Sequence, residues 1–125
     1  MAPVSKGRAW AGRVLSALAV LFLVFDGVTK VLAVPQVVEA TARLGYSPVS
    51  TTRIGVLLLI LTCIYLIPRT ARVGALLLTG YLGGAVASQV RIEASPFPIV
   101  FPVLFAGLIW AGLALRDRSL AVLNP

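Results

Sequence analysis

Long apolar runs broken by short polar stretches dominate the pattern along the chain. Four runs are predicted to cross a bilayer as helices, since a span needs about 20 residues at about 1.5 Å rise each. They cover about residues 10–34, 52–68, 71–92 and 97–115. The second run is short for a span and is expected to borrow a turn from the loop before it. The runs are continuous rather than alternating, which favours helices over strands. We therefore predict an all-α membrane protein, a bundle of four transmembrane helices forming one domain over residues 1–125.

The longest polar stretch, residues 35–52, separates the first two runs. Its apolar positions recur as in a short amphipathic helix at the membrane interface, and they are Val37, Val38, Ala42 and Leu44. Gly45 lies where such a helix would end, and Ser50 or Thr51 is placed to cap the next span. Pro35 is expected to close the first span, because the residue before a proline disfavours the helical region.

Composition supports a bilayer environment. Hydrophobic residues make up 59% of the chain and charged residues 12%, whereas soluble domains carry about 25% charged residues. Too few polar side chains remain to coat a water-exposed surface, so the apolar residues must face lipid. The net charge of +7 does not indicate nucleic-acid binding, because the basic residues are scattered singly and form no stripe with interleaved aromatics.

The basic residues are distributed unevenly between the two ends of the predicted bundle. With four spans, both termini share a side with the turn between the second and third spans. Seven of the eleven basic residues lie on that side: Lys6, Arg8, Arg13, Arg69, Arg72, Arg116 and Arg118. The other side holds Lys30, Arg43, Arg53 and Arg91. Because cytoplasmic ends carry the excess of basic residues, we predict that both termini are inside.

Asp26 and Lys30 are charged positions inside the first span, where a charge costs about 2.5–3.5 kcal/mol on insertion scales. Their i,i+4 spacing puts them on one helix face in the favourable acid-then-base order. One interpretation is a self-satisfied ion pair with Lys30 snorkelling outward. The other is a buried carboxylate that binds a ligand or moves a proton. Either way, we expect Asp26 to point into the bundle within reach of Lys30, Gln89 or Arg91.

Threading the spans brings further polar residues to the same outer depth. Asp26 gathers there with Gln89 and with three cations, Lys30, Arg53 and Arg91. One acid among three cations predicts either an anion-attracting pocket or a mutually neutralised network, although Arg53 and Arg91 also fit as interface anchors. Tyr65 and Tyr81 lie inside spans and need hydrogen-bond partners, so each either packs in the bundle or lines a cavity. The candidate ligand-binding residues are Asp26, Lys30, Arg53, Tyr65, Tyr81, Gln89 and Arg91, with Asp26 as the candidate catalytic group.

Small residues form a stripe on the third span, Gly80-x-x-x-Gly84-x-x-x-Ser88. Such a stripe lets another helix approach closely, either the first span or a second copy of the chain in a homo-oligomer. The chain has no histidine and one cysteine, so no metal site is expected. Searches for a Gly-rich phosphate loop, a nucleophile elbow and a Cys-x-x-Cys motif find none.

Several segments resemble the DoxX-like family of small bacterial membrane proteins. They include Phe25-Asp26-Gly27-Val28-Thr29-Lys30, Leu44-Gly45-Tyr46, Tyr65 to Thr70, Gly74 to Arg91, Phe101 to Phe105 and Leu115-Arg116-Asp117. The resemblance covers almost the whole chain. It implies a multi-pass protein of the bacterial inner membrane, a four-helix bundle serving a membrane redox system. A quinone ligand and an oxidoreductase partner are implied by the resemblance alone.

Two positions depart from the family pattern. Members commonly carry an acidic residue early in the second span, where this chain reads Gly55 to Leu59, and a histidine in the third span, where it has Gln89. A proton relay from an acid to an imidazole is therefore absent. Gln89 can still donate and accept hydrogen bonds, but it cannot titrate.

Three functional hypotheses follow from these observations. The first is an accessory or binding protein that holds a lipophilic small molecule, with its polar head at the outer cluster. The second is a membrane enzyme that uses Asp26 as general acid or base in an isomerisation or cyclisation. The third is a structural subunit that forms oligomers, which would be favoured if the bundle contained no cavity.

Overall fold

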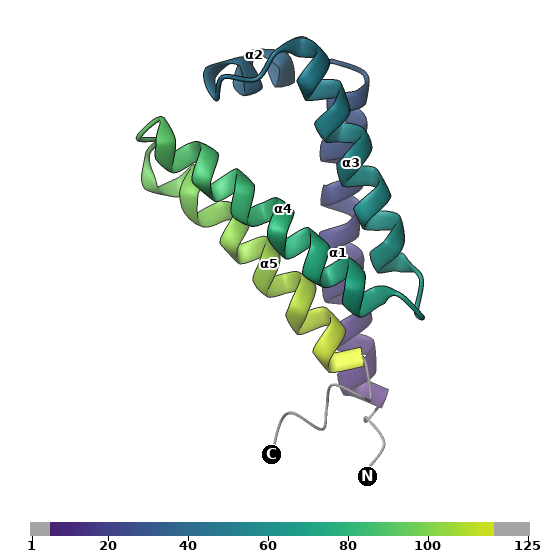
Figure 1. The fold of residues 1–125 in the computed structure, drawn as a ribbon. Coiled ribbons are helices and arrows are strands. Elements are labelled where there is room, and N and C mark those ends of the chain that lie inside the picture. Colours follow the sequence, from purple (N-terminus) through teal and green to yellow (C-terminus); the bar gives the residue numbers. More distant parts are fainter. Residues whose placement is uncertain (1–5, 117–125) are drawn as a thin grey trace.

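A computed structural model describes residues 6–116, and this part of the chain is helical with short connections (Figure 1). Its helices are α1 (Lys6–Val31), α2 (Pro35–Arg43), α3 (Pro48–Leu66), α4 (Ala71–Arg91) and α5 (Pro96–Arg116). All except the short α2 are long and apolar enough to cross a membrane. The predicted all-α architecture with four spans is thus confirmed, and so is the short helix between the first two spans. The predicted orientation of the termini stays a prediction.

The four long helices form two pairs that diverge from one end (Figure 1). Helix α1 packs along α3, and α4 packs along α5. The pairs are joined by contacts of α1 with α5 and of α3 with α4, whereas the backbones of α1 and α4 do not come close to each other within residues 6–116. The start of α1 and the end of α5 lie at the narrow end, and α2 lies across the wide end (Figure 1). The bundle is therefore closed at the narrow end and splayed at the opposite end.

The tightly packed core holds the pairs together. Its fully buried large side chains come from all four long helices: Leu23, Leu58, Tyr65, Leu78, Ile109 and Leu113. The hydroxyl of Tyr65 donates to the carbonyl of Ile109 at 2.9 Å and shares a hydrogen bond with Ser16 at 3.0 Å. Many other large apolar side chains are exposed on the outside, such as Leu21 and Leu76. An apolar exterior of this extent fits contact with lipid rather than water.

Close helix contact occurs at glycines other than those predicted. A Cβ on Gly74 would lie 2.4 Å from the backbone of Tyr65, and one on Gly112 would lie 2.4 Å from the hydroxyl of Ser16. The predicted stripe behaves differently, because a Cβ on Gly80 or Gly84 would have nothing within 4 Å. The expectation that this stripe draws α1 close is wrong, since α4 leaves α1 as the pairs diverge toward the wide end.

The helix boundaries shift at two connections. Helix α1 ends at Val31, and the chain turns at Ala33, which has a positive φ of 53°, before Pro35 begins α2. Helix α3 begins at Pro48, earlier than predicted, because Ser47 caps it by accepting from the backbone N–H of Ser50 at 3.1 Å. Neither Ser50 nor Thr51 is the cap. Gly45, with a φ of +94°, follows the end of α2 as predicted.

Candidate functional site

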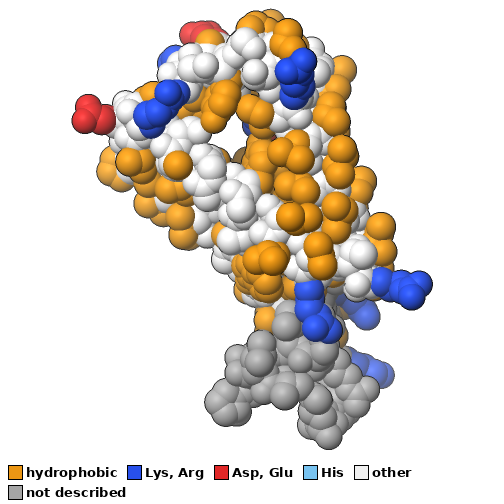
Figure 2. All heavy atoms as spheres, viewed as in Figure 1, with side chains coloured by type: hydrophobic (Ala, Val, Ile, Leu, Met, Phe, Trp, Pro, Cys, Tyr) orange, Lys and Arg blue, Asp and Glu red, His pale blue; other side chains and the backbone are white. Residues whose placement is uncertain are grey.

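A cavity of about 650 Å³ lies between the two helix pairs, toward the wide end of the bundle that α2 covers. Its volume falls within the range of small-molecule sites, roughly 300–1,000 Å³. The space-filling view shows a hollow between α4 and α3, below α2 (Figure 2). Most of its wall is apolar and comes from all four long helices: Phe22, Leu23, Ile54, Leu57, Leu82, Phe101 and Phe105.

Three phenylalanines form an aromatic wall between α1 and α5. The ring of Phe22 stacks on Phe105 with centroids 4.3 Å apart and meets the edge of Phe101 at 5.3 Å. Phe101 and Phe105 are themselves 4.9 Å apart. Aromatic pairs at these separations stabilise the packing beyond what the burial of their apolar surface contributes. The wall fixes one side of the cavity one helical turn away from Asp26, because Phe22 and Asp26 are four residues apart on α1.

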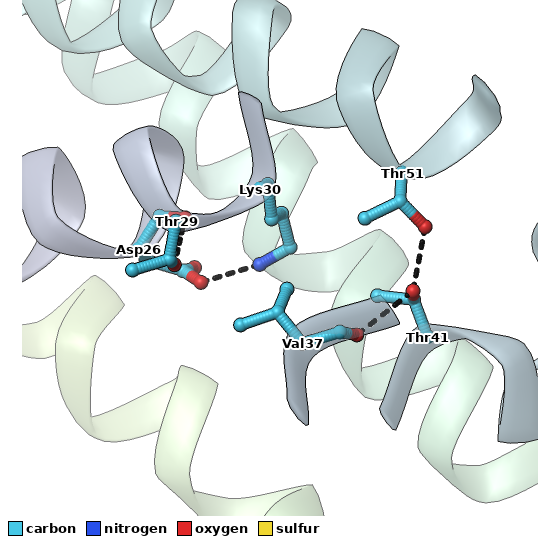
Figure 3. A network of polar contacts seen from close by, with 6 residues as sticks. All are labelled: Asp26, Thr29, Lys30, Val37, Thr41 and Thr51. Carbon is cyan, nitrogen blue, oxygen red and sulfur yellow. Dashed lines mark hydrogen bonds and ion pairs between the residues drawn. The ribbon is translucent and has the colours of Figure 1, made fainter. Parts of the chain in front are cut away.

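Asp26 and Lys30 form an ion pair on the cavity side of α1 (Figure 3). The ammonium of Lys30 donates to one carboxylate oxygen of Asp26, and both residues line the cavity. Their side chains are 13% exposed for Lys30 and 28% for Asp26. The hydroxyl of Thr29 donates to the backbone carbonyl of Asp26 at 2.9 Å. The expectation that Asp26 points inward and pairs with Lys30 is therefore confirmed.

The predicted partnership of Asp26 with Arg91 is not formed. The guanidinium of Arg91 instead donates to the carbonyl of Leu44, which follows the last residue of α2. That carbonyl belongs to a helix end, where backbone acceptors lack intrahelical partners and basic side chains often supply them. Arg91 thus connects the end of α4 to the end of α2, and it does not line the cavity.

The structure gathers four of the seven predicted binding residues at the cavity: Asp26, Lys30, Tyr81 and Gln89. Besides Arg91, two residues are elsewhere. Arg53 is exposed on α3, as an interface anchor would be. Tyr65 is fully buried in the core and bonded to Ile109. Sequence reasoning placed Arg53 and Arg91 by depth alone, and depth does not fix which side of a helix a residue occupies. For Tyr65 it left packing and cavity lining open, and packing is what the structure has.

Helix α2 and the loop after it close the wide end, a feature that sequence reasoning did not include in the site. The hydroxyls of Thr41 and Thr51 are 2.6 Å apart and fasten α2 to α3 (Figure 3). The hydroxyl of Tyr46 bonds with that of Ser88 at 2.9 Å and fastens the loop to α4. Thr41 counts among the polar positions of the predicted amphipathic helix, but it follows Val37 and Val38 at spacings of four and three. It therefore shares their helix face, and that spacing was the available signal for this contact.

Other polar groups at the cavity have no hydrogen-bond partner within residues 6–116. These are the hydroxyl of Tyr81 and the side-chain amides of Gln36 and Gln89. Tyr81 and Gln89 belong to α4, and Gln36 belongs to α2. All are uncharged groups that can accept a hydrogen bond and donate one. The site therefore combines an apolar chamber, one ion pair and several open neutral donors and acceptors.

A sequence model of the DoxX-like family matches residues 14–112. The chain belongs to the DoxX-like family. The matched range includes every residue that lines the cavity of this DoxX-like protein. Comparison with curated proteins and with solved structures found no match.

Proposed function

We propose that this DoxX-like protein binds a lipophilic small molecule in the cavity between its two helix pairs. The carrying observation is a chamber of about 650 Å³ with mainly apolar walls and a few polar groups from α1, α2 and α4. Ligand sites of helix bundles have this composition, because apolar walls supply affinity and a few polar groups orient the head. A chamber of this kind also favours a binding role over a purely structural one.

The opening of the cavity supports a ligand that arrives from the bilayer. The wide end is covered by α2, which Thr41 and Tyr46 fasten to the neighbouring helices. The hollow between α4 and α3 instead faces the side of the bundle (Figure 2). A lipophile dissolved in the membrane would enter through that side and place its polar end near Asp26 and Tyr81.

A quinone is the specific ligand that family resemblance suggests, with the protein as accessory subunit to an oxidoreductase. The residues present fit such a head group. The hydroxyl of Tyr81 and the amide of Gln89 are open donors for ring carbonyls, and the aromatic wall of Phe22, Phe101 and Phe105 offers a flat surface for a ring. When bound, a quinone would supply the redox chemistry, and these residues would orient it.

Filling the cavity tests the proposal with a matched pair of variants. Gly84 lines the cavity and Gly83 does not, and a Cβ on either would meet nothing within 4 Å. Gly84→Leu should therefore fill the chamber, whereas Gly83→Leu should place the same side chain outside it. Native mass spectrometry of the proteins purified in mild detergent measures retained lipophile. Loss in Gly84→Leu with retention in Gly83→Leu is expected, and equal retention in both would contradict the proposal.

Asp26 supports a second candidate function, an enzyme acting on the bound lipophile. Its carboxylate lines the cavity, and Lys30 engages one of the two oxygens. In this role the other oxygen would exchange a proton with the substrate in an isomerisation or cyclisation. Asp26→Asn keeps the shape of the side chain and removes proton transfer. Conversion of the lipophile by wild type but not by Asp26→Asn would favour an enzyme, and full conversion by the variant would exclude this role for Asp26.

A further inference from the structure

The charged groups at the cavity cancel each other. Among the described residues that line it, Asp26 is the one acid and Lys30 the one base, and they are bonded to each other. The remaining polar liners are uncharged: Gln36, Thr41, Tyr46, Tyr81, Ser88 and Gln89. The chamber therefore offers no spare charge to neutralise a charged head group.

The other two cations of the predicted outer cluster, Arg53 and Arg91, do not line the cavity. Arg91 donates to the carbonyl of Leu44 and lies against Gly45, where it connects α4 to the end of α2. Arg53 is exposed on α3 and does not line the cavity. The alternative of an anion-attracting pocket, which the sequence left open, thus loses two of its three cations. What remains is a neutralised pair.

An uncharged head group finds partners where a charged one does not. Tyr81, Gln36 and Gln89 present open donors and acceptors. Thr41 already bonds to Thr51 on α3, and Tyr46 and Ser88 bond to each other. A hydroxyl or carbonyl oxygen can pair with the open groups at little cost. A carboxylate or ammonium would lose its hydration on entering the cavity and find no opposite charge there. This costs far more free energy than burying a paired polar group.

Resting on the proposed function, we infer that the cavity selects a neutral lipophile whose polar end is a hydroxyl or carbonyl, and discriminates against the acid or amine of the same chain. The Asp26–Lys30 pair sets this selectivity, because each side chain already neutralises the charge of the other and leaves none for a ligand. Breaking the pair on either side should change which head group is bound.

Three ligands of equal chain length test the inference: hexadecanol, hexadecanoate and hexadecylammonium. Each is titrated into the detergent-solubilised protein and followed by native mass spectrometry, the acid at alkaline pH, the amine near neutral pH and the alcohol at both. Wild type should bind hexadecanol about tenfold or more tightly than either charged ligand, a difference of about 1.4 kcal/mol or more. Gly84→Leu, which fills the chamber, should weaken all binding that occurs there.

Charge variants give the second part of the test. Asp26→Asn leaves Lys30 without its acid and should raise the affinity for hexadecanoate relative to hexadecanol. Lys30→Met should do the same for hexadecylammonium, and the double variant should return to preferring hexadecanol. The inference is overturned if wild type binds a charged ligand as tightly as the alcohol, or if neither single variant shifts the preference. Failure of wild type to bind any of the three would instead overturn the proposed function and the inference with it.

Discussion

Tyr65 and Tyr81 lie on neighbouring helices, yet only Tyr81 faces the cavity. Tyr65 is fully buried, and its hydroxyl bonds to Ser16 and to the carbonyl of Ile109. The hydroxyl of Tyr81 has no such partner within residues 6–116. One tyrosine thus stabilises the junction of three helices, and the other offers a hydrogen bond to a ligand.

This difference predicts that replacing tyrosine by phenylalanine lowers stability at one position and weakens ligand binding at the other. Tyr65→Phe should lower the free energy of unfolding by about 1 kcal/mol, because it removes a buried hydroxyl and its hydrogen bonds, and should leave hexadecanol binding unchanged. Tyr81→Phe should weaken hexadecanol binding severalfold with little change in stability. Thermal unfolding in detergent and ligand titration measure the two quantities. A loss of binding in Tyr65→Phe at unchanged stability would contradict the assignment.

At the scale of elements, the glycines of α4 separate into packing and non-packing positions. Gly74 meets the backbone of Tyr65, which cannot move aside as a flexible side chain would. Gly83 has open space around it. The α3–α4 contact therefore depends on the absence of a side chain at Gly74, and the surface around Gly83 does not.

We predict that Gly74→Ala destabilises the protein by about 2 kcal/mol, within the range for overpacking a well-packed contact. Gly83→Ala is the matched control on the same helix and should be neutral or stabilising by up to about 1 kcal/mol, because alanine favours the helix. Unfolding in detergent by heat or denaturant compares the two. Equal destabilisation would show that α4 does not approach α3 closely at Gly74.

The sequence predicts the helices better than it predicts the site, and the reason is physical. Apolar run length sets the spans, so their number and positions follow from the chain. Depth in the membrane also follows, which is why Asp26, Lys30 and Gln89 were correctly grouped. The splay of the two pairs and the rotation of each helix depend on packing between distant segments. Arg91 was misplaced for that reason, and for the same reason the sequence left open whether Tyr65 packs in the bundle or lines a cavity.

At the scale of the whole molecule, the two ends of the bundle differ. The exposed turn between α3 and α4 carries Arg69 at the end where α1 begins and α5 ends, and the connection between α4 and α5 carries Glu93 at the other end (Figure 1). If both termini are cytoplasmic, as the distribution of basic residues predicts, α2 and the wide end of the bundle lie on the outer side.

Cysteine labelling in intact cells tests this orientation. In a Cys63→Ser background, which removes the exposed native thiol, a membrane-impermeant maleimide should label Glu93→Cys directly. Arg69→Cys should react only after the cells are permeabilised. The reverse pattern would place the termini outside and invert the predicted topology.

Photo-crosslinking with a diazirine analogue of hexadecanol tests most directly whether the cavity holds a lipophile. Cavity occupancy predicts saturable labels on Ile54, Leu82 and Phe105, which line the chamber from α3, α4 and α5. Excess hexadecanol should compete these labels away, and Gly84→Leu should abolish them while Gly83→Leu does not. Labels confined to outward-facing residues such as Leu76 and Leu104, unaffected by competitor or by Gly84→Leu, would contradict the account.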